Sequence, residues 1–130
     1  MRGAIVGLDH VQVAAPRGCE AEARAFYGGL LGLEELVKPP RLAGRGGAWF
    51  SLGAGEIHVG VDDAFTPARQ AHPALLVDPE RLDELAGALR DAGHPTVWDA
   101  EIPEVRRFFT ADPWGNRLGL VAEGRSEWSV

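Results

Sequence analysis

Three of the four histidines in this 130-residue chain stand in apolar stretches typical of β-strands. His10 lies in Leu-Asp-His-Val-Gln-Val, His58 in Ile-His-Val, and His72 just before Pro-Ala-Leu-Leu-Val. Neutral imidazole is the commonest protein ligand of divalent metals, and three such ligands with an open position are typical of a catalytic centre. The residue types therefore allow a site for Zn, Ni, Mn or Fe. Each histidine taken alone could instead be a structural strand residue.

The second half of the chain repeats the first, and the repeat favours the metal site over that alternative. Matching positions lie 59 to 62 residues apart, and they include His10 with His72, Trp49-Phe50 with Phe108-Phe109, and Ala23, Phe26, Tyr27 and Leu30 with Leu82, Leu85, Ala86 and Leu89. Offsets this constant indicate two copies of one supersecondary unit. We expect a first module over residues 1–66 and a second over residues 67–130.

Hydrophobic periodicity and turn residues predict the same elements in each half. The first half is expected to hold a strand at 5–13, a helix at 20–31, and strands at 34–38, 48–52 and 55–61. The second half is expected to hold a strand at 72–77, a helix starting after Asp78-Pro79 and running to about 92, and strands near 95–99, 105–110 and 117–122. The predicted fold is α+β, with two tandem βαβββ modules whose curved mixed sheets surround a cavity.

Strand alternation separates the side chains under each helix from those on the opposite face. His10, His58 and His72 all fall on the faces away from the helices. Gln12 and Trp49 of the first half, and Arg107 and Phe109 of the second, are predicted to share those faces. Aromatic rings with one cation and one amide suit a small anionic or aromatic ligand. Trp49 and Phe109 could alternatively fill the core, and His94, after a helix end, is expected at the surface.

Composition excludes several classes of partner. The net charge is −6 at pH 7, whereas binding of nucleic acid needs a basic surface. No apolar run approaches the length of a membrane span, and the single cysteine, Cys19, cannot form an internal disulfide. We therefore expect a cytoplasmic protein that binds a small molecule, with neither nucleic acid nor membrane as partner.

Four segments together resemble the vicinal oxygen chelate superfamily, the group of glyoxalases, bleomycin-resistance proteins and extradiol dioxygenases. They are Leu8-Asp9-His10-Val11-Gln12-Val13, Ala25-Phe26-Tyr27 followed by Leu30-Leu31-Gly32-Leu33, Ala71-His72-Pro73-Ala74, and Asp112-Pro113 followed by Gly115-Asn116-Arg117-Leu118. The resemblance spans about residues 5–122. It implies paired βαβββ modules, a divalent metal held inside by their first and last strands, and a homodimer, often with the site built across the subunit interface.

Carried over position by position, the family's ligand places fall on His10, His58, His72 and Gly119. The first three match, but family members usually have a glutamate where this chain has Gly119. In glyoxalase-like members that glutamate takes part in proton transfer, so its absence argues against glyoxalase I activity. Glu56 shares the face of His58 by strand alternation. Two functions stay open: a metal-dependent lyase or dioxygenase, favoured by the histidines, and a metal-free binding protein of the bleomycin-resistance type, favoured by Gly119.

Overall fold

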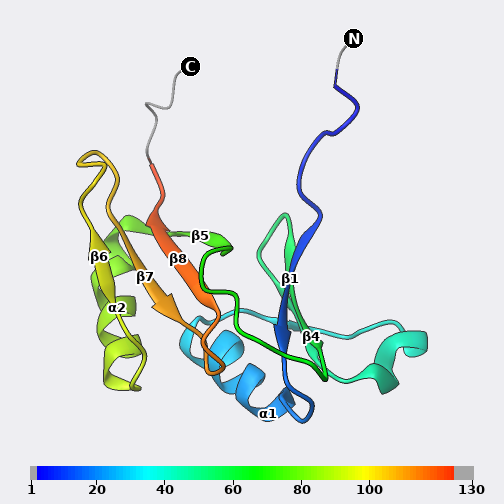
Figure 1. Ribbon diagram of the computed structural model, residues 1–130. Helices are drawn as coiled ribbons and strands as arrows, with labels where there is room; N and C mark the ends of the chain where they lie inside the picture. Colours follow the sequence, from blue (N-terminus) through cyan, green and yellow to red (C-terminus); the bar gives the residue numbers. More distant parts are fainter. Residues whose placement is uncertain (1–2, 125–130) are drawn as a thin grey trace. The chain divides into compact units, whose positions relative to one another are not determined.

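The computed structural model describes residues 3–124 and divides into two compact units, Met1–Thr66 and Pro67–Val130. Each unit contains one four-stranded mixed sheet with a helical segment between its first and second strands (Figure 1). This is the predicted βαβββ arrangement, present twice. The sheets are open: in both, the first strand of the unit forms one edge.

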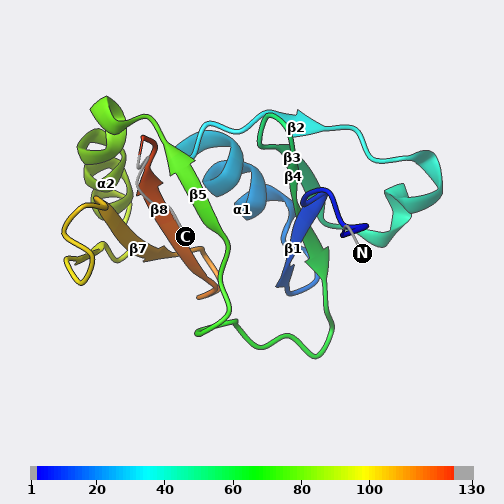
Figure 2. The same ribbon diagram turned by 90° about the horizontal axis from the view of Figure 1, so that it is seen from above.

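The first unit has the strand order β1-β4-β3-β2, with β1 parallel to β4 and the other neighbours antiparallel. Figure 2 shows β1 beside β4. In chain order its elements are β1 (His10–Ala15), α1 (Glu20–Ala23), a π-helix (Arg24–Leu30), β2 (Glu35–Leu36), a 3-10 helix (Pro40–Arg45), β3 (Ala48–Ser51) and β4 (Glu56–Val61).

The second unit has the equivalent order β5-β8-β7-β6, again with one parallel pair, β5 with β8. In chain order its elements are β5 (Ala74–Val77), a 3-10 turn (Pro79–Arg81), α2 (Leu82–Asp91), β6 (Val97–Asp99), β7 (Arg107–Ala111) and β8 (Arg117–Ala122). Leu82, Ala86 and Leu89 form the buried face of α2, and the buried Phe108, Leu118 and Leu120 come from the strands of the sheet.

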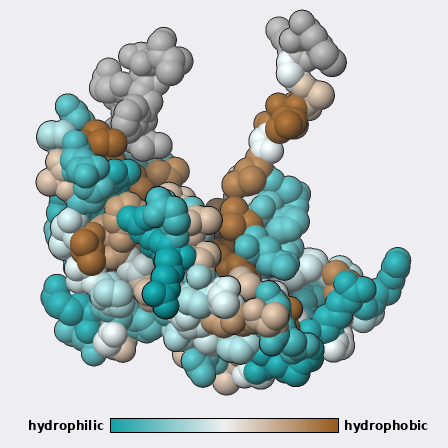
Figure 3. All heavy atoms as spheres, in the orientation of Figure 1, coloured by the Kyte–Doolittle hydropathy of each residue, from teal (hydrophilic) through white to brown (hydrophobic). Residues whose placement is uncertain are grey.

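The predicted first strand, 5–13, is wrong at its start, because β1 begins at His10. The backbone N–H of Glu56 donates to the carbonyl of Asp9, and beyond this bond the β4 chain turns away through Gly53–Gly55. Residues 3–8 therefore extend past the end of the neighbouring strand. Ile5, Val6 and Leu8 are 91%, 98% and 76% exposed, and they form part of the apolar segment below the grey N-terminal residues in Figure 3.

The other element boundaries shift by smaller amounts. β5 begins at Ala74, so His72 precedes the strand instead of lying in it. The predicted helix at 20–31 is α-helical only to Ala23 and continues as a π-helix to Leu30. The N–H of Leu31 reaches the carbonyl of Phe26, five residues back, at 2.9 Å. The predicted buried face is nonetheless present, since Ala23, Phe26 and Tyr27 are buried.

The predicted helix signals of the second unit are confirmed. The Asp78 carboxylate accepts from the backbone N–H of Glu80 at 2.9 Å, and Pro79 occupies the first turn. Gly93, just past the end of α2, has a φ of 91°, which a glycine adopts without strain.

The turn Asp112–Asn116 ties the start of the second unit to its last strand. The Asp112 carboxylate accepts from the backbone N–H groups of Trp114 and Asn116 at 3.1 and 2.9 Å. The Asn116 side-chain oxygen in turn accepts from the N–H of Ala68, and the N–H of Arg117 donates to the Ala68 carbonyl. The turn therefore positions both the segment leading to His72 and the first residue of β8.

Across residues 3–124, none of the helices has the length and apolar character needed to cross a membrane.

Gly47 offers a sharp test of the first unit's packing. Its φ is 81°, and a Cβ there would overlap the carbonyl oxygen of Val59 in β4. Gly47→Ala should therefore lower the free energy of unfolding by about 2 kcal/mol or more, as measured by urea denaturation. Gly44→Ala is the matched control, because nothing lies within 4 Å of the position that its methyl group would take. Equal stability of the two variants would contradict this packing.

Candidate functional site

The parallel pairing of β1 with β4 brings two of the predicted histidines together. His10 is the register partner of Glu56, and Gln12 is the partner of His58. On the other side of β4, Trp49 of β3 is the partner of His58. All five side chains belong to one face of the sheet by strand alternation, as the sequence predicted.

Three of these rings form a stack. The Trp49 and His58 rings are parallel within 1°, with centroids 3.9 Å apart. The His10 ring lies 4.2 Å from His58 at an interplanar angle of 16°. His58 is therefore enclosed between two rings and is 6% exposed, whereas His10 at the edge stays accessible.

Each imidazole of the stack has a carboxylate partner. His10 Nδ1 lies 2.8 Å from Asp9 Oδ2, and His58 Nε2 lies 2.8 Å from Glu56 Oε1. A carboxylate acceptor sets which ring nitrogen holds the proton and leaves the other with its lone pair. The nitrogens left to accept a proton or an ion are then Nε2 of His10 and Nδ1 of His58.

This arrangement of the rings differs from that of two ligands on one ion. An imidazole lone pair lies in the plane of its ring, so two parallel stacked rings direct their lone pairs along separate planes. Within residues 3–124, no three His, Cys, Asp or Glu side chains form a group able to hold a metal. Uptake of a shared ion would therefore require the His10–His58 stack to open.

His72 belongs to the second unit, where it is exposed ahead of β5. Its Nδ1 lies 2.9 Å from the carbonyl oxygen of Gln70, which holds the proton on Nδ1 and leaves the lone pair on Nε2. The edge of its ring meets Phe109, with centroids 5.3 Å apart. The structure thus places His10 and His58 together in one unit and His72 beside Phe109 in the other.

The predicted ligand-binding residues divide in the same way. Gln12 and Trp49 stand with the histidine stack, and the Gln12 amide covers Gly60, where a Cβ would come within 2.6 Å of its Nε2. Arg107 and Phe109 lie on β7, and Arg107 binds Asp99 Oδ2 through Nε at 2.9 Å and Nη2 at 2.6 Å. The carboxylate partners Asp9 and Asp99 were not predicted from the sequence, because strand alternation does not show which side chains pair with each other.

His94, expected at the surface, is half-buried in the second unit. Its Nδ1 lies 2.9 Å from the carbonyl oxygen of Ala111, at the end of β7. The helix end that precedes it therefore packs against the sheet through this side chain.

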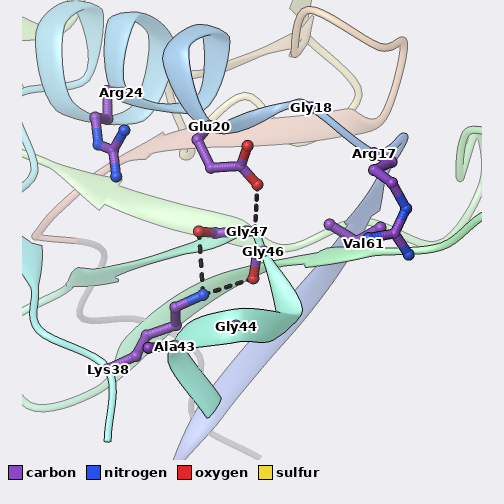
Figure 4. Close-up of a pocket in the computed structure, with 10 residues that line it drawn as sticks. All are labelled: Arg17, Gly18, Glu20, Arg24, Lys38, Ala43, Gly44, Gly46, Gly47 and Val61. Atoms are coloured by element: carbon purple, nitrogen blue, oxygen red, sulfur yellow. Dashed lines mark hydrogen bonds between the residues drawn. The ribbon is translucent and has the colours of Figure 1, made fainter. Parts of the chain in front are cut away.

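A second feature missed by the sequence analysis is a pocket of about 430 Å³ in the first unit, between the start of α1 and the 3-10 helix (Figure 4). Three cations, Arg17, Arg24 and Lys38, line it together with Glu20. Arg17 is paired with Asp63 and Arg24 with Glu35, both at 2.9 Å.

Lys38 and Glu20 hold the glycine-rich segment at the wall of this pocket. Lys38 Nζ donates to the carbonyls of Gly46 and Gly47 at 2.6 and 3.3 Å, while the N–H of Gly47 donates to Glu20 Oε2 at 2.6 Å. This last bond lowers the pKa of Glu20 below its ordinary value. The charged groups of the pocket already have partners within the unit. We therefore interpret the pocket as structural, with Lys38 and Glu20 fixing the segment that leads into β3.

Cys19, next to this pocket, is buried, and its burial raises the pKa of the thiol. A raised pKa reduces the thiolate fraction at neutral pH, and thiolate is the reactive form. Cys19 is therefore a core residue of the first unit and no candidate nucleophile.

Comparison with solved structures places the chain among proteins of one fold. A protein from Bacillus anthracis described as belonging to the glyoxalase family has 49% sequence identity and a TM-score of 0.88, over 95% of this chain and 100% of its own. A glyoxalase/dioxygenase from Nostoc punctiforme has 18% identity and a TM-score of 0.76, over 95% of both chains.

A third similar structure is a mutant of the fosfomycin resistance protein FosX from Listeria monocytogenes, in complex with Mn(II) and dihydroxypropylphosphonic acid. Its identity is 18% and its TM-score 0.72, over 90% of both chains. At this identity the likeness concerns the fold alone. No protein-family model and no curated protein sequence matches the chain.

The Glu20–Gly47 hydrogen bond should be visible in the pH dependence of stability. A folded-state pKa below the ordinary value means that ionised Glu20 stabilises the fold above about pH 4.5, and that this contribution is lost as the pH falls through the lowered value. Glu20→Gln should cost roughly 1 kcal/mol at pH 7 and progressively less below pH 4.5. Urea denaturation at several pH values measures this.

The control for that series is Glu22→Gln, which removes an exposed carboxylate from the same helical turn. It should leave the unfolding free energy nearly unchanged from pH 3 to pH 7. A Glu20→Gln effect that is the same at pH 3 and pH 7 would contradict the assigned role of the ionised carboxylate.

Proposed function

Because this chain belongs to the glyoxalase family within the vicinal oxygen chelate superfamily, we propose that it is a metal-dependent enzyme acting on a small oxygen-bearing molecule. His10, His58 and His72 would hold a divalent ion, of Zn, Ni, Mn or Fe. Such an ion supplies a Lewis acid that polarises an oxygen of a chelated substrate or of dioxygen. The proposed reaction class is that of a lyase or dioxygenase.

The observation that supports this proposal most directly is the pairing of each stacked imidazole with a carboxylate. Metal-binding histidines almost always donate their second ring N–H to a carboxylate, carbonyl or water, which orients the ring and raises its basicity. Asp9 does this for His10, Glu56 for His58, and the Gln70 carbonyl for His72. All three predicted ligands therefore have a partner of the kind a ligand needs.

The remaining residues of the face would act on the substrate. Trp49 covers one side of His58 and excludes water from it, because the two rings are stacked with centroids 3.9 Å apart. Gln12, one strand away, offers an amide that can both donate and accept. The Mn(II) and small organic ligand in the FosX structure support a role of this fold in presenting a metal to a small molecule.

Gly119 favours a second candidate function, a metal-free binding protein of the bleomycin-resistance type. At this position the superfamily usually has an acid that ligates the metal. The Trp49–His58–His10 stack, whose outer ring His10 stays accessible, can serve as a binding surface without opening. Absence of metal uptake by the pure protein would support this function.

Metal binding can be tested residue by residue. After dialysis against a chelator, the protein should take up one equivalent of Zn, Ni, Mn or Fe at pH 7.5. It should release the ion when the solution is acidified, because protonated imidazole cannot bind it. His10→Ala, His58→Ala and His72→Ala should each weaken binding by more than about tenfold in calorimetry.

His94→Ala is the matched control, since His94 binds a backbone carbonyl in the second unit and stands outside the proposed ligand set. It should bind metal as the wild type does. Four variants of equal affinity, or no uptake of any of the four metals, would reject the metal centre and leave the binding protein.

We also propose that the protein is a cytoplasmic homodimer. The family resemblance leads to this proposal, and the exposed apolar segment with Ile5, Val6 and Leu8 supports it, because a partner subunit would bury this surface. His72 could then join His10 and His58 from the same chain or from the partner.

Light scattering at micromolar concentration should give twice the mass of one chain. Val6→Glu should shift the protein towards the monomer, because a charge would enter the buried interface. Val37→Glu, which alters an equally exposed valine elsewhere in the same unit, should not. A wild-type mass equal to one chain would contradict the dimer.

A further inference from the structure

The half-buried face of the second sheet, opposite the buried Phe108, Leu118 and Leu120, holds two arginines around one aromatic ring. Phe109 of β7 is the register partner of Gly119 in β8, and Arg107 and Arg117 belong to the same face by strand alternation. With His72 these residues form what we call the Phe109 cluster. All its members belong to the second unit, and Asp99, which binds Arg107, is the carboxylate beside them.

The two arginines of the Phe109 cluster differ in how their charges are balanced. Arg107 is bound to Asp99 by two hydrogen bonds, and both side chains are largely buried. The Arg117 guanidinium lies over the Phe109 ring, with Cζ 3.9 Å from the ring centroid. Among the described residues Arg117 has no salt bridge, so its N–H groups are not bound to a carboxylate. The pKa of Asp99 is lowered first by the backbone N–H of Glu101, then by Arg107, and to a smaller extent by the charge of Arg117.

The position of Arg117 makes it suitable for binding an anion. A guanidinium lying on an aromatic ring keeps its N–H donors at its edges, where they match both oxygens of a carboxylate. The ring also removes water from one side of the guanidinium, which strengthens its interaction with an anion. The Asn116 turn and the backbone bond from Arg117 to Ala68 fix the chain at this point.

Gly119 is buried in β8 and lets the Phe109 ring lie close against the strand beside this cation. Its backbone does not require glycine, since its φ is not positive. A Cβ there would lie 3.4 Å from both Ala74 Cβ and Phe109 Cε1, so a larger side chain would displace the ring on which Arg117 lies. An acid at this position would also neutralise the unpaired cation. Glycine therefore leaves Phe109 in place and adds no negative charge beside Arg117.

We propose that the Phe109 cluster binds the carboxylate of a small aromatic or planar acid, with Arg117 as the anchoring residue. This inference rests on the proposed function, because it names the class of substrate or ligand that the same face would take. The carboxylate site itself needs no metal, so the two claims can fail separately.

The test uses the full-length protein kept free of metal by a chelator, with benzoate as the probe and NMR titration of backbone amides as the measurement. Benzoate should shift the amides of β7 and β8, and neutral benzamide should bind at least about tenfold more weakly. Arg117→Gln should weaken benzoate binding by at least about tenfold. Arg117→Lys keeps the positive charge but lacks the paired N–H donors of the guanidinium, so it should retain part of the benzoate affinity.

Arg106→Gln is the matched control, because Arg106 precedes β7 by one residue and pairs with Asp83 of α2. It should leave benzoate affinity unchanged. Gly119→Glu gives a second, independent readout: it should abolish benzoate binding while tightening metal binding by adding an anionic donor. Amide spectra of all variants show whether they are folded.

The proposal is overturned if folded Arg117→Gln binds benzoate as the wild type does, or if benzamide binds equally well. It is also overturned if the shifts lie outside β7 and β8. Benzoate binding by a protein that takes up no metal would support the carboxylate site and reject the metal-dependent function.

Discussion

The parallel pairing between the first and last strands of each unit is the constraint on which the candidate site depends. In an antiparallel hairpin the strands follow each other directly, but parallel strands must be connected by a crossover. Here the helix and two further strands form that crossover. The pairing sets His10 opposite Glu56 in the first unit and Ala74 opposite Gly119 in the second, so side chains distant in sequence share one face.

The two faces created by this pairing differ in charge, although the units share one topology. In the first unit each imidazole of the stack is bound to a carboxylate, and His58 is buried. In the second unit two arginines and an imidazole surround Phe109, and a single carboxylate balances one of them. The first face therefore groups imidazoles with carboxylates, whereas the second groups arginines around an aromatic ring.

Much of the fold could be predicted because local signals and the internal repeat agreed. The cap at Asp78, the turn at Asp112–Asn116 and the alternating burial of β1 all follow from residues close in sequence. The start of β1 could not be predicted, because apolar residues 5–8 have strand character but lack a neighbouring strand in the unit. The π-helix could not be predicted either, because the spacing of Ala23, Phe26 and Tyr27 indicates a buried helical face but does not specify a bond to the carbonyl five residues back.

For the candidate site, the sequence predicted which side chains share a face but not how they touch. Strand alternation predicted that Trp49, His58 and His10 lie on one face of the sheet, but it did not predict that their rings would stack. The carboxylates of Asp9 and Asp99 were missed for the same reason, since each reaches its partner through side-chain conformation. Arg117 stood in a recognised motif, but the motif did not indicate that its guanidinium would lie over Phe109.

The central claim is that His10, His58 and His72 bind one divalent ion, and a crystal structure of the zinc-loaded protein tests it most directly. Anomalous scattering at the zinc edge should give one peak about 2.1 Å from a nitrogen of each imidazole, with the His10–His58 stack opened. Crystals of zinc-treated protein without such a peak, and with Trp49, His58 and His10 still stacked, would contradict the account.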